Sequence, residues 1–263
     1  MQTATSPAPQ PGTATGHRCC QLSVLIPVYN ESRTLPALLE RLGAVDFPIA
    51  LEVIIVNDAS SDGTAELLQA YADRPGFRVV HLAKNQGKAA AIRTAIAHAT
   101  GDVFVIQDAD LEYDPGELPA LLGPILDGRA EVVYGSRFLG AMHGMAWHHR
   151  LGNRLLTWVT NVLYGQRLTD METCYKMALA EVYRNFTIET SRFELEPEIT
   201  AKILRQGRRI VELPISFAGR GRGEGKKISW VDGFGALRTL VRFRWRGRQE
   251  SAPGQWSKTR PEA

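Results

Sequence analysis

Three acidic residues alternate along the chain in the sequence Asp108-x-Asp110-x-Glu112 and directly follow the apolar run 103–107. In an extended segment alternate side chains point the same way, so we expect the three carboxylates to converge. Like charges at such short range repel unless a cation holds them, and carboxylates together with substrate phosphates suit Mg²⁺ or Mn²⁺. The sequence therefore predicts a divalent metal site at Asp108, Asp110 and Glu112. The alternative is a solvated acidic turn.

Two more polar residues follow predicted strands. Asp58 leaves the end of the run 51–57, where its carboxylate is placed to accept an N–H from a nucleobase. Lys88 follows Gly87 and opens a predicted helix, and a helix N-terminus favours anions. The simpler readings are a capped turn and a solvated lysine. Neither GxxxxGK[ST] nor GxGxxG is present, which argues against a Walker A loop and a dinucleotide-binding site.

The elements that must position these residues alternate in type. Short β-branched runs predict strands at 22–28, 51–57, 77–82, 103–107, 131–135 and 209–217, and apolar periodicity predicts helices at 34–43, 64–72, 88–99 and 116–126. Strands alternating with helices indicate an α/β fold with a mostly parallel sheet. Ligands bind beyond the carboxyl ends of such strands, where the first, second and fourth predicted strands deliver their polar residues.

Composition places the chain among ordinary globular proteins. It has 263 residues and a formal charge of +3, with 44 % hydrophobic and 22 % charged residues, which excludes a wholly disordered or collagenous chain. Three cysteines form no disulfide framework and favour a reducing, cytoplasmic setting. We predict a disordered leader over 1–20, which lacks the features of a signal peptide, one domain over 21–245, and a flexible tail over 246–263.

Positive charge gathers at the C-terminus. From residue 220 onward, eleven Lys or Arg residues stand against four Asp or Glu residues. Residues 229–245 predict a basic amphipathic helix that either lies on an anionic membrane surface or packs its apolar face on the domain. No transmembrane segment is expected, because the longest uncharged apolar run, 155–166, is shorter than the roughly 20 residues that a span needs. No base-reading motif favours a nucleic-acid partner.

Eight segments, in order, resemble the family 2 glycosyltransferases of the GT-A fold, in particular the dolichol/polyprenyl-phosphate mannosyl- and glucosyltransferase-like branch. They are SVLIPVYNE (23–31), VNDASSDGT (56–64), KNQGKAAAI (84–92), QDADLEYDP (107–115), VYGSRF (133–138), TDMETCYK (169–176), FELEPEI (193–199) and PISFAGRGRGEGKKISWVDG (214–233). Two stretches depart from the family pattern. The second strand ends in Asn57-Asp58 instead of the commoner Asp-Asp, and 139–150 has no secure counterpart.

The resemblance implies a Rossmann-like nucleotide-binding sheet and a set of site residues. The nucleotide pocket would be lined by Pro27, Tyr29 and Glu31, with Asp58 on the base. Asp108 and Asp110 would hold the metal on the sugar-nucleotide diphosphate, with Glu112 beside them. Arg137 would meet the acceptor phosphate. Arg220, with Lys226 nearby, would meet the donor diphosphate.

The implied reaction is an inverting, metal-dependent transfer of a hexose from a GDP-Man or UDP-Glc type donor to a polyprenyl or dolichyl phosphate, on the inner face of the plasma membrane. A phosphate acceptor is already ionised at neutral pH and needs no base. If the acceptor is instead a soluble sugar or glycan hydroxyl, Asp170 is the candidate base. A third hypothesis is a catalytically idle protein that binds anionic lipid or nucleic acid.

Overall fold

The computed structural model describes residues 19–190, 194–219 and 230–246. Its main sheet has seven strands in the order β3-β2-β1-β4-β7-β5-β8. Their bounds are β1 Gln21–Val28, β2 Ala50–Asn57, β3 Phe77–His81, β4 Val103–Ile106, β5 Val132–Ser136, β7 Lys176–Leu179 and β8 Ile210–Pro214. Only β7 runs antiparallel to its neighbours β4 and β5. The predicted α/β fold with a mostly parallel sheet is confirmed.

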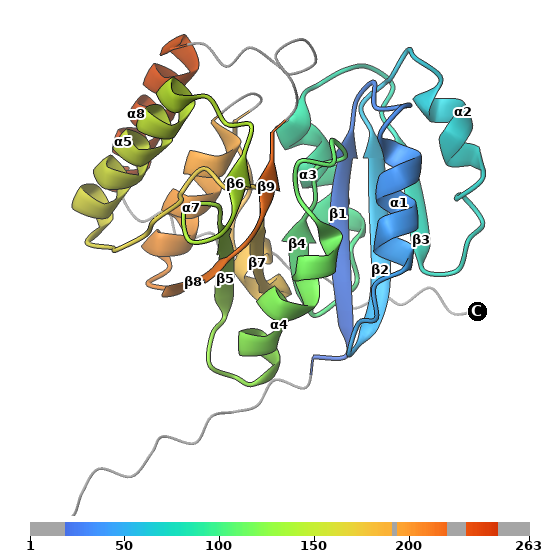
Figure 1. The fold of residues 1–263 in the computed structure, drawn as a ribbon, viewed down its shortest axis with the longest axis horizontal. Coiled ribbons are helices and arrows are strands. Elements are labelled where there is room, and N and C mark those ends of the chain that lie inside the picture. The colour runs from blue at the N-terminus through green and yellow to red at the C-terminus, as the bar shows by residue number, and fades with distance from the viewer. Residues whose placement is uncertain (1–18, 191–193, 220–229, 247–263) are drawn as a thin grey trace, which may run out of the picture.

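Helices flank this sheet, and a two-stranded ribbon lies beside it (Figure 1). The helices are α1 Leu35–Gly43, α2 Thr64–Gln69, α3 Lys88–His98, α4 Leu118–Leu126, α5 Trp147–Tyr164, α6 Ala180–Arg184, α7 Leu195–Arg205 and α8 Trp230–Trp245, with a 3₁₀ turn at Pro115–Glu117. The ribbon pairs β6 Met142–His143 with β9 Phe217–Ala218 in parallel. The single strand expected over 209–217 is therefore wrong. Its chain leaves the main sheet after Pro214 and joins the ribbon at Phe217.

The core lies between the sheet and its helices. The central strands β1, β2 and β4 contribute near-continuous buried runs, as strands covered on both faces must. The strand order also explains where a ligand belongs. β1 is flanked by β2 on one side and β4 on the other, which makes the β1/β4 boundary the point where the connections diverge.

Helices α5, α7 and α8 form a group beyond the β5–β8 side of the sheet (Figure 1). The apolar residues of 155–163 are divided between the two faces of α5. Leu156, Val159 and Leu163 pack inward, whereas Leu155 and Trp158 are exposed. Helix α8 buries Leu240 and Phe243 in the same cluster. Within the described ranges, none of the helices is long and apolar enough to cross a membrane.

Candidate active site

The loops after β1, β2 and β4 meet at the carboxyl edge of the sheet. The backbone N–H of Asn30 donates to Ser60 Oγ at 2.9 Å, and the Asn30 side chain accepts from the Ser61 N–H at 2.8 Å. Among the residues that the structure describes, the non-glycine residues with positive φ are Asn30 (56°), Ala59 (56°) and Leu111 (61°), one in each loop. Such backbone is costly and gathers at functional sites, which marks this edge as the candidate site.

The predicted cluster of three carboxylates is not formed. Strand β4 ends at Ile106, and the left-handed Leu111 turns the chain between Asp110 and Glu112, so the segment is not extended. Asp110 Oδ1 instead accepts the Glu112 backbone N–H at 3.2 Å. No three His, Cys, Asp or Glu side chains gather into a metal-binding group in the described part of the chain.

Lys88 lies against Asp108 instead of against open solvent. Its Nζ is 2.8 Å from Asp108 Oδ1 and 2.9 Å from Glu196 Oε1, at the start of α7. Burial alone would lower the pKa of Lys88, but the two carboxylates outweigh it and raise that pKa well above its ordinary value. Sequence analysis assigned no role to Glu196, although it falls within the FELEPEI segment. The ammonium of Lys88 is therefore shared between Asp108 and Glu196 and offsets part of their negative charge.

The two other acidic residues of this loop have the chemistry to bind a divalent cation. Asp110 and Glu112 are both half-buried, and they supply the hard oxygen ligands that Mg²⁺ and Mn²⁺ take. Mg²⁺ is commonly bound by one or two carboxylates and substrate phosphates instead of by an all-protein cage. The residues present therefore fit a cation that arrives with a diphosphate.

Asp58 is nearly fully buried, at 2 % exposure. Its two carboxylate oxygens accept the backbone N–H groups of Gln86 and Gly87, each at 2.7 Å. The carboxylate thus holds the loop that leads into Lys88 and α3. Its contact with a nucleobase stays a prediction, as do the pocket roles of Pro27, Tyr29 and Glu31. Tyr29 is 44 % exposed at the end of β1, and Glu31 Oε2 accepts from Thr34 Oγ1 at 2.6 Å.

Asn57, where the family pattern favours Asp, has a local explanation. Its amide nitrogen lies 3.0 Å from His81 Nδ1, and its amide oxygen accepts the Ser60 backbone N–H at 3.0 Å. An amide both donates and accepts, whereas an ionised carboxylate only accepts. Asn57 therefore ties β3 to the loop after β2 without a proton on His81 Nδ1, whereas an ionised aspartate would require His81 to donate from Nδ1.

Arg137 and Asp170 form a buried ion pair. Arg137 Nε donates to Asp170 Oδ2 at 2.7 Å, and a terminal guanidinium nitrogen donates to Oδ1 at 2.8 Å. Asp170 is fully buried, and its backbone N–H donates to Glu212 at 2.9 Å. A general base must reach the proton that it removes. This geometry does not favour the base role expected for Asp170 and shows a carboxylate that orients Arg137.

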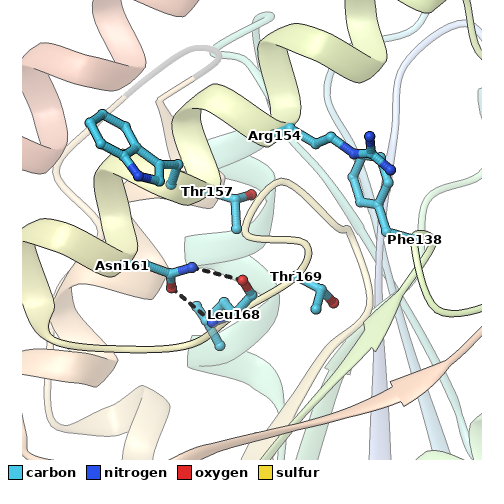
Figure 2. A pocket seen from close by; sticks show the side chains of 7 residues that line it. Phe138, Arg154, Thr157, Asn161, Leu168 and Thr169 are labelled. Atoms are coloured by element: carbon cyan, nitrogen blue, oxygen red, sulfur yellow. Dashed lines mark hydrogen bonds between the residues drawn. The ribbon is translucent and has the colours of Figure 1, made fainter.

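Two adjoining pockets open beside Arg137. One, of about 310 Å³, is lined by Arg137, Phe138, Gly140, Met142, Arg150 and Arg154. The other, of about 380 Å³, is lined by Phe138, Arg154, Thr157, Trp158, Asn161, Leu168 and Thr169 (Figure 2). They share Phe138 and Arg154, whose guanidinium lies 5.2 Å from the Phe138 ring centre. The first pocket is cationic and the second carries apolar walls.

Sequence analysis missed Arg150 and Arg154. Their separation of four residues places them on one side of a helix, but the helix was not predicted in this Met/His/Trp-rich stretch. In contrast, Arg220 and Lys226, expected near the donor diphosphate, lie outside the described residues, so their roles stay predictions.

The sequence and structure resemble known glycosyltransferases. A model of glycosyl transferase family 2 matches residues 23–186. Dolichol-phosphate mannosyltransferase of Pyrococcus furiosus is 28 % identical over 86 % of this chain and 65 % of its own length. Undecaprenyl-phosphate 4-deoxy-4-formamido-L-arabinose transferase of Edwardsiella ictaluri is 34 % identical over 78 % of this chain and 62 % of its own length. Undecaprenyl-phosphate mannosyltransferase of Micrococcus luteus is 30 % identical over 85 % of this chain and 95 % of its own length. The chain thus spans less than two thirds of the first two relatives.

Solved structures share the fold. Glucosyl-3-phosphoglycerate synthase of Mycobacterium tuberculosis, in complex with Mn²⁺, UDP and phosphoglyceric acid, is 18 % identical with a TM-score of 0.65, over 86 % of this chain and 77 % of its own. TarS 1–349 of S. aureus, in complex with UDP-GlcNAc, is 18 % identical with a TM-score of 0.62, over 85 % of this chain and 66 % of its own. These likenesses confirm the predicted GT-A fold.

Proposed function

The chain belongs to glycosyl transferase family 2, and from that premise we propose that it transfers a hexose from a nucleotide-diphosphate sugar to a polyprenyl phosphate. The pair of adjoining pockets carries this proposal. Arg137, Arg150 and Arg154 line a cationic pocket that suits a phosphate, and Phe138, Trp158 and Leu168 give the next pocket walls that suit an isoprenoid chain. Relatives named for dolichol phosphate and undecaprenyl phosphate support the same acceptor class.

The donor belongs at the edge beyond β1 and β4. Asp110 and Glu112 would hold Mg²⁺ or Mn²⁺ there, and Asp108 beside them is paired with Lys88. The cation would supply positive charge to the diphosphate leaving group. Arg220 and Lys226 are proposed to add to it, by the resemblance alone. Solved relatives bound to UDP with Mn²⁺ or Mg²⁺ support a nucleotide and a metal in this fold.

Arg137 positions the acceptor in this proposal. Asp170 fixes the guanidinium through two parallel hydrogen bonds, which orients it. A phosphate monoester is already ionised at neutral pH and attacks without a base. A single attack from the face opposite the leaving group inverts the anomeric centre. A sugar hydroxyl acceptor would need a base, and the ion pair with Arg137 makes the buried Asp170 a poor candidate for that role, which supports the phosphate acceptor.

The test is transfer of radiolabel from UDP- and GDP-hexoses into an organic-extractable product, with a short-chain polyprenyl phosphate as acceptor. We expect label to enter the organic phase with one donor class and with added Mg²⁺ or Mn²⁺. Arg154→Gln should weaken use of the acceptor, whereas Arg129→Gln, a change to an exposed arginine remote from the pockets, should not. Label that reaches only water-soluble glycans would contradict the proposal.

A further inference from the structure

The ion pair with Asp170 holds the guanidinium of Arg137 along one edge. Arg137 Nε and a terminal nitrogen donate to the two oxygens of Asp170, at 2.7 and 2.8 Å. Two hydrogen bonds along one edge fix that edge, but they resist a tilt of the guanidinium plane about it only weakly. The tilt matters because it decides where the remaining N–H groups of Arg137 point, and Arg137 lines the cationic pocket.

The ring of Phe217 lies against one face of this guanidinium. Arg137 Cζ lies over the ring, 5.4 Å from its centre, which is within the range of a cation–π interaction. Phe217 is 6 % exposed and the side chain of Arg137 is 7 % exposed, so water screens this contact little. The attraction is therefore stronger than the same contact would be on the surface, and it opposes a tilt of the guanidinium plane.

Phe217 is itself held from two sides. Its ring meets Tyr113 edge to face, with 5.5 Å between the ring centres and 74° between the ring planes. Its backbone N–H donates to the carbonyl oxygen of Ala141 at 2.9 Å, and it pairs with Met142 in the β6–β9 ribbon (Figure 1). Because a displacement of the ring would break these contacts, Phe217 can act as a fixed stop for Arg137.

The segments that hold Phe217 also form a wall of the cationic pocket. Met142, which is opposite Phe217 in the ribbon, lines that pocket together with Gly140. A Cβ at Gly140 would lie 2.1 Å from the carbonyl oxygen of Ile215, so a side chain there would force apart the two segments that lead into β6 and β9. The position of the ring is therefore tied to the wall of the pocket that it serves.

We propose that Phe217 is a positioning residue for the acceptor, because its ring sets the tilt of the Arg137 guanidinium and thereby aims the remaining N–H groups at the phosphate. The proposal deepens the proposed function, on which it rests for the identity of the acceptor. Asp170 supplies the opposite charge and fixes one edge of the guanidinium, and Phe217 fixes its plane. Both residues act through Arg137, which alone of the three meets the phosphate.

A different role for Phe217 would lie at the donor. The carbonyl oxygen of Glu112 accepts the backbone N–H of Ala218 at 3.0 Å, and Tyr113 is the next residue in the chain, so β9 also contacts the loop after β4. A role in holding that loop would change the affinity for nucleotide, whereas a role at Arg137 changes the affinity for phosphate. Measuring both affinities in one variant separates the two.

The experiment is isothermal titration of the full chain with a short-chain polyprenyl phosphate and, separately, with UDP or GDP and Mg²⁺. Phe217→Leu keeps an apolar side chain and removes the ring face. We expect it to weaken binding of polyprenyl phosphate about tenfold, as the loss of a desolvated cation–π interaction implies, and to change nucleotide affinity by less than about twofold. Equal losses for phosphate and nucleotide would place Phe217 in the donor loop and overturn the proposal.

Fluorinated phenylalanines at position 217 test the same interaction almost without a change of shape, so they remain measurable even if Phe217→Leu unfolds the protein. Successive ring fluorines withdraw electrons from the ring face in steps and slightly enlarge the apolar surface. A cation–π interaction with Arg137 predicts a stepwise loss of phosphate affinity, whereas packing alone predicts none. Phosphate affinity that stays at the parent value throughout the series would overturn the proposal.

Phe77 is the matched control. It also carries an arginine over its ring, with Arg74 Cζ 4.7 Å from the centre, but it belongs to the edge strand β3 and lines neither pocket. Phe77→Leu and the same fluorinated series at position 77 should leave the affinities for phosphate and nucleotide unchanged. A loss there equal to that at Phe217 would reveal a general effect of the substitutions and contradict the assignment.

Transfer assays separate this proposal from the proposed function. If phosphate affinity follows the ring at position 217 but no hexose reaches polyprenyl phosphate, the proposed function fails and the role of Phe217 stands. If hexose is transferred while phosphate affinity ignores the ring, the proposed function stands and the role of Phe217 fails. A parent protein that binds no polyprenyl phosphate, with or without nucleotide, would overturn both.

Discussion

Arg137 and Asp170 show how a charge is kept inside this protein. Both side chains are almost fully buried, and the pair survives there because two side-chain hydrogen bonds and one from the Arg137 backbone N–H satisfy the carboxylate. The cost of removing both charges from water makes such a pair a modest source of stability. Removing one partner, however, leaves the other as an uncompensated buried charge. The two residues therefore depend on each other.

Asp170→Asn should consequently destabilise the fold. The neutral asparagine amide cannot balance the charge of Arg137. Its NH₂ group would also replace one carboxylate oxygen and face an Arg137 N–H donor. We expect a loss of about 3–5 kcal/mol in the free energy of unfolding, measured by urea denaturation. Asp127→Asn is the matched control, because Asp127 pairs with Arg129 on the surface and should cost about 0–1 kcal/mol. Equal losses in the two variants would contradict the buried-pair argument.

Glu172 is the residue whose pH dependence is most informative. Its Oε1 is buried and has no hydrogen-bond partner among the described residues. Burial, with the nearby Glu196 charge, raises the pKa of Glu172 from 4.5 to about 8, while Lys176 and Arg137 oppose that rise. The unfolded chain therefore releases this proton at lower pH than the folded protein does, and stability falls as pH rises between those two values.

Glu172→Gln should remove that fall, because glutamine copies the neutral carboxyl without titrating. We expect melting temperatures of parent and variant to be similar near pH 5 and to diverge toward pH 8, where the variant is the more stable. Circular dichroism melts across that range provide the measurement. Glu66→Gln, a change to an exposed carboxylate on α2, should leave the parent profile unchanged. A variant that loses stability with pH as the parent does would refute the assignment.

At the level of residues, sequence reasoning named candidate positions but not their partners. Asp58, Asp108, Arg137 and Asp170 each make side-chain contacts in the structure, and their functional roles stay predictions. Their contacts could not be read from spacing, because those contacts come from distant segments, as with Glu196 and Lys88. Asp108, Asp110 and Glu112 do not converge because Leu111 has a positive φ, which turns the chain between Asp110 and Glu112. A leucine rarely adopts this conformation, so the sequence did not predict the turn.

Elements with strong apolar runs were predictable, and mixed ones were not. Strands β1, β2 and β4 are buried on both faces, so their apolar runs revealed both their type and the edge at which the site lies. Strand β7 has four residues in an Ala/Met/Leu segment that reads equally as helix. Helix α5 was not predicted from the sequence. It carries apolar residues on two faces, one packed on the core and one exposed, so it lacks the single apolar stripe that indicates an amphipathic helix.

The loop before α3 gives a prediction at the level of elements. Asp58 holds this loop by accepting two backbone N–H groups, from Gln86 and Gly87. In Asp58→Asn one acceptor becomes a donor that faces an N–H, and a buried polar group left unpaired costs about 1–3 kcal/mol. We expect faster amide exchange in residues 85–88 and weaker donor binding, because the loop also positions Lys88 beside Asp108.

Hydrogen exchange followed by mass spectrometry measures that loosening, and isothermal titration with UDP or GDP measures the affinity. Asp73→Asn, which alters an exposed carboxylate in the turn after α2, is the control and should change neither. Exchange in 85–88 at the parent rate would show that the two hydrogen bonds do not hold the loop. Lost binding with unchanged exchange would instead return Asp58 to the nucleobase contact that sequence analysis expected.

At the level of the whole molecule, an acidic region and a basic region lie next to each other. Acidic residues occupy the loop after β4, where we propose that a cation and a diphosphate bind together, and arginines line the pocket beside Arg137. A donor that carries its own metal fits the first place, and an anionic acceptor fits the second. The opposite signs favour different substrates at the two places, because carboxylates repel a bare phosphate and arginines attract it.

Donor binding should therefore require the metal, and this is testable on the intact protein without turnover. A ligand that binds the folded state alone stabilises it by about 2.7 kcal/mol when present at one hundred times its dissociation constant. For a chain of this size that is a rise of several degrees in melting temperature. We expect UDP or GDP to produce it with Mg²⁺ or Mn²⁺ and to produce little with a chelator.

Asp110→Asn should abolish the metal-dependent part of that shift, since it removes a ligand charge while preserving shape. The unliganded variant should melt near the parent temperature, because Asp110 is only half-buried and the asparagine amide oxygen can still accept the Glu112 backbone N–H. Asp73→Asn again serves as the control and should keep the full shift. A nucleotide shift that survives both the chelator and Asp110→Asn would show that positive side chains alone hold the diphosphate, and the cation would then have no place in donor binding.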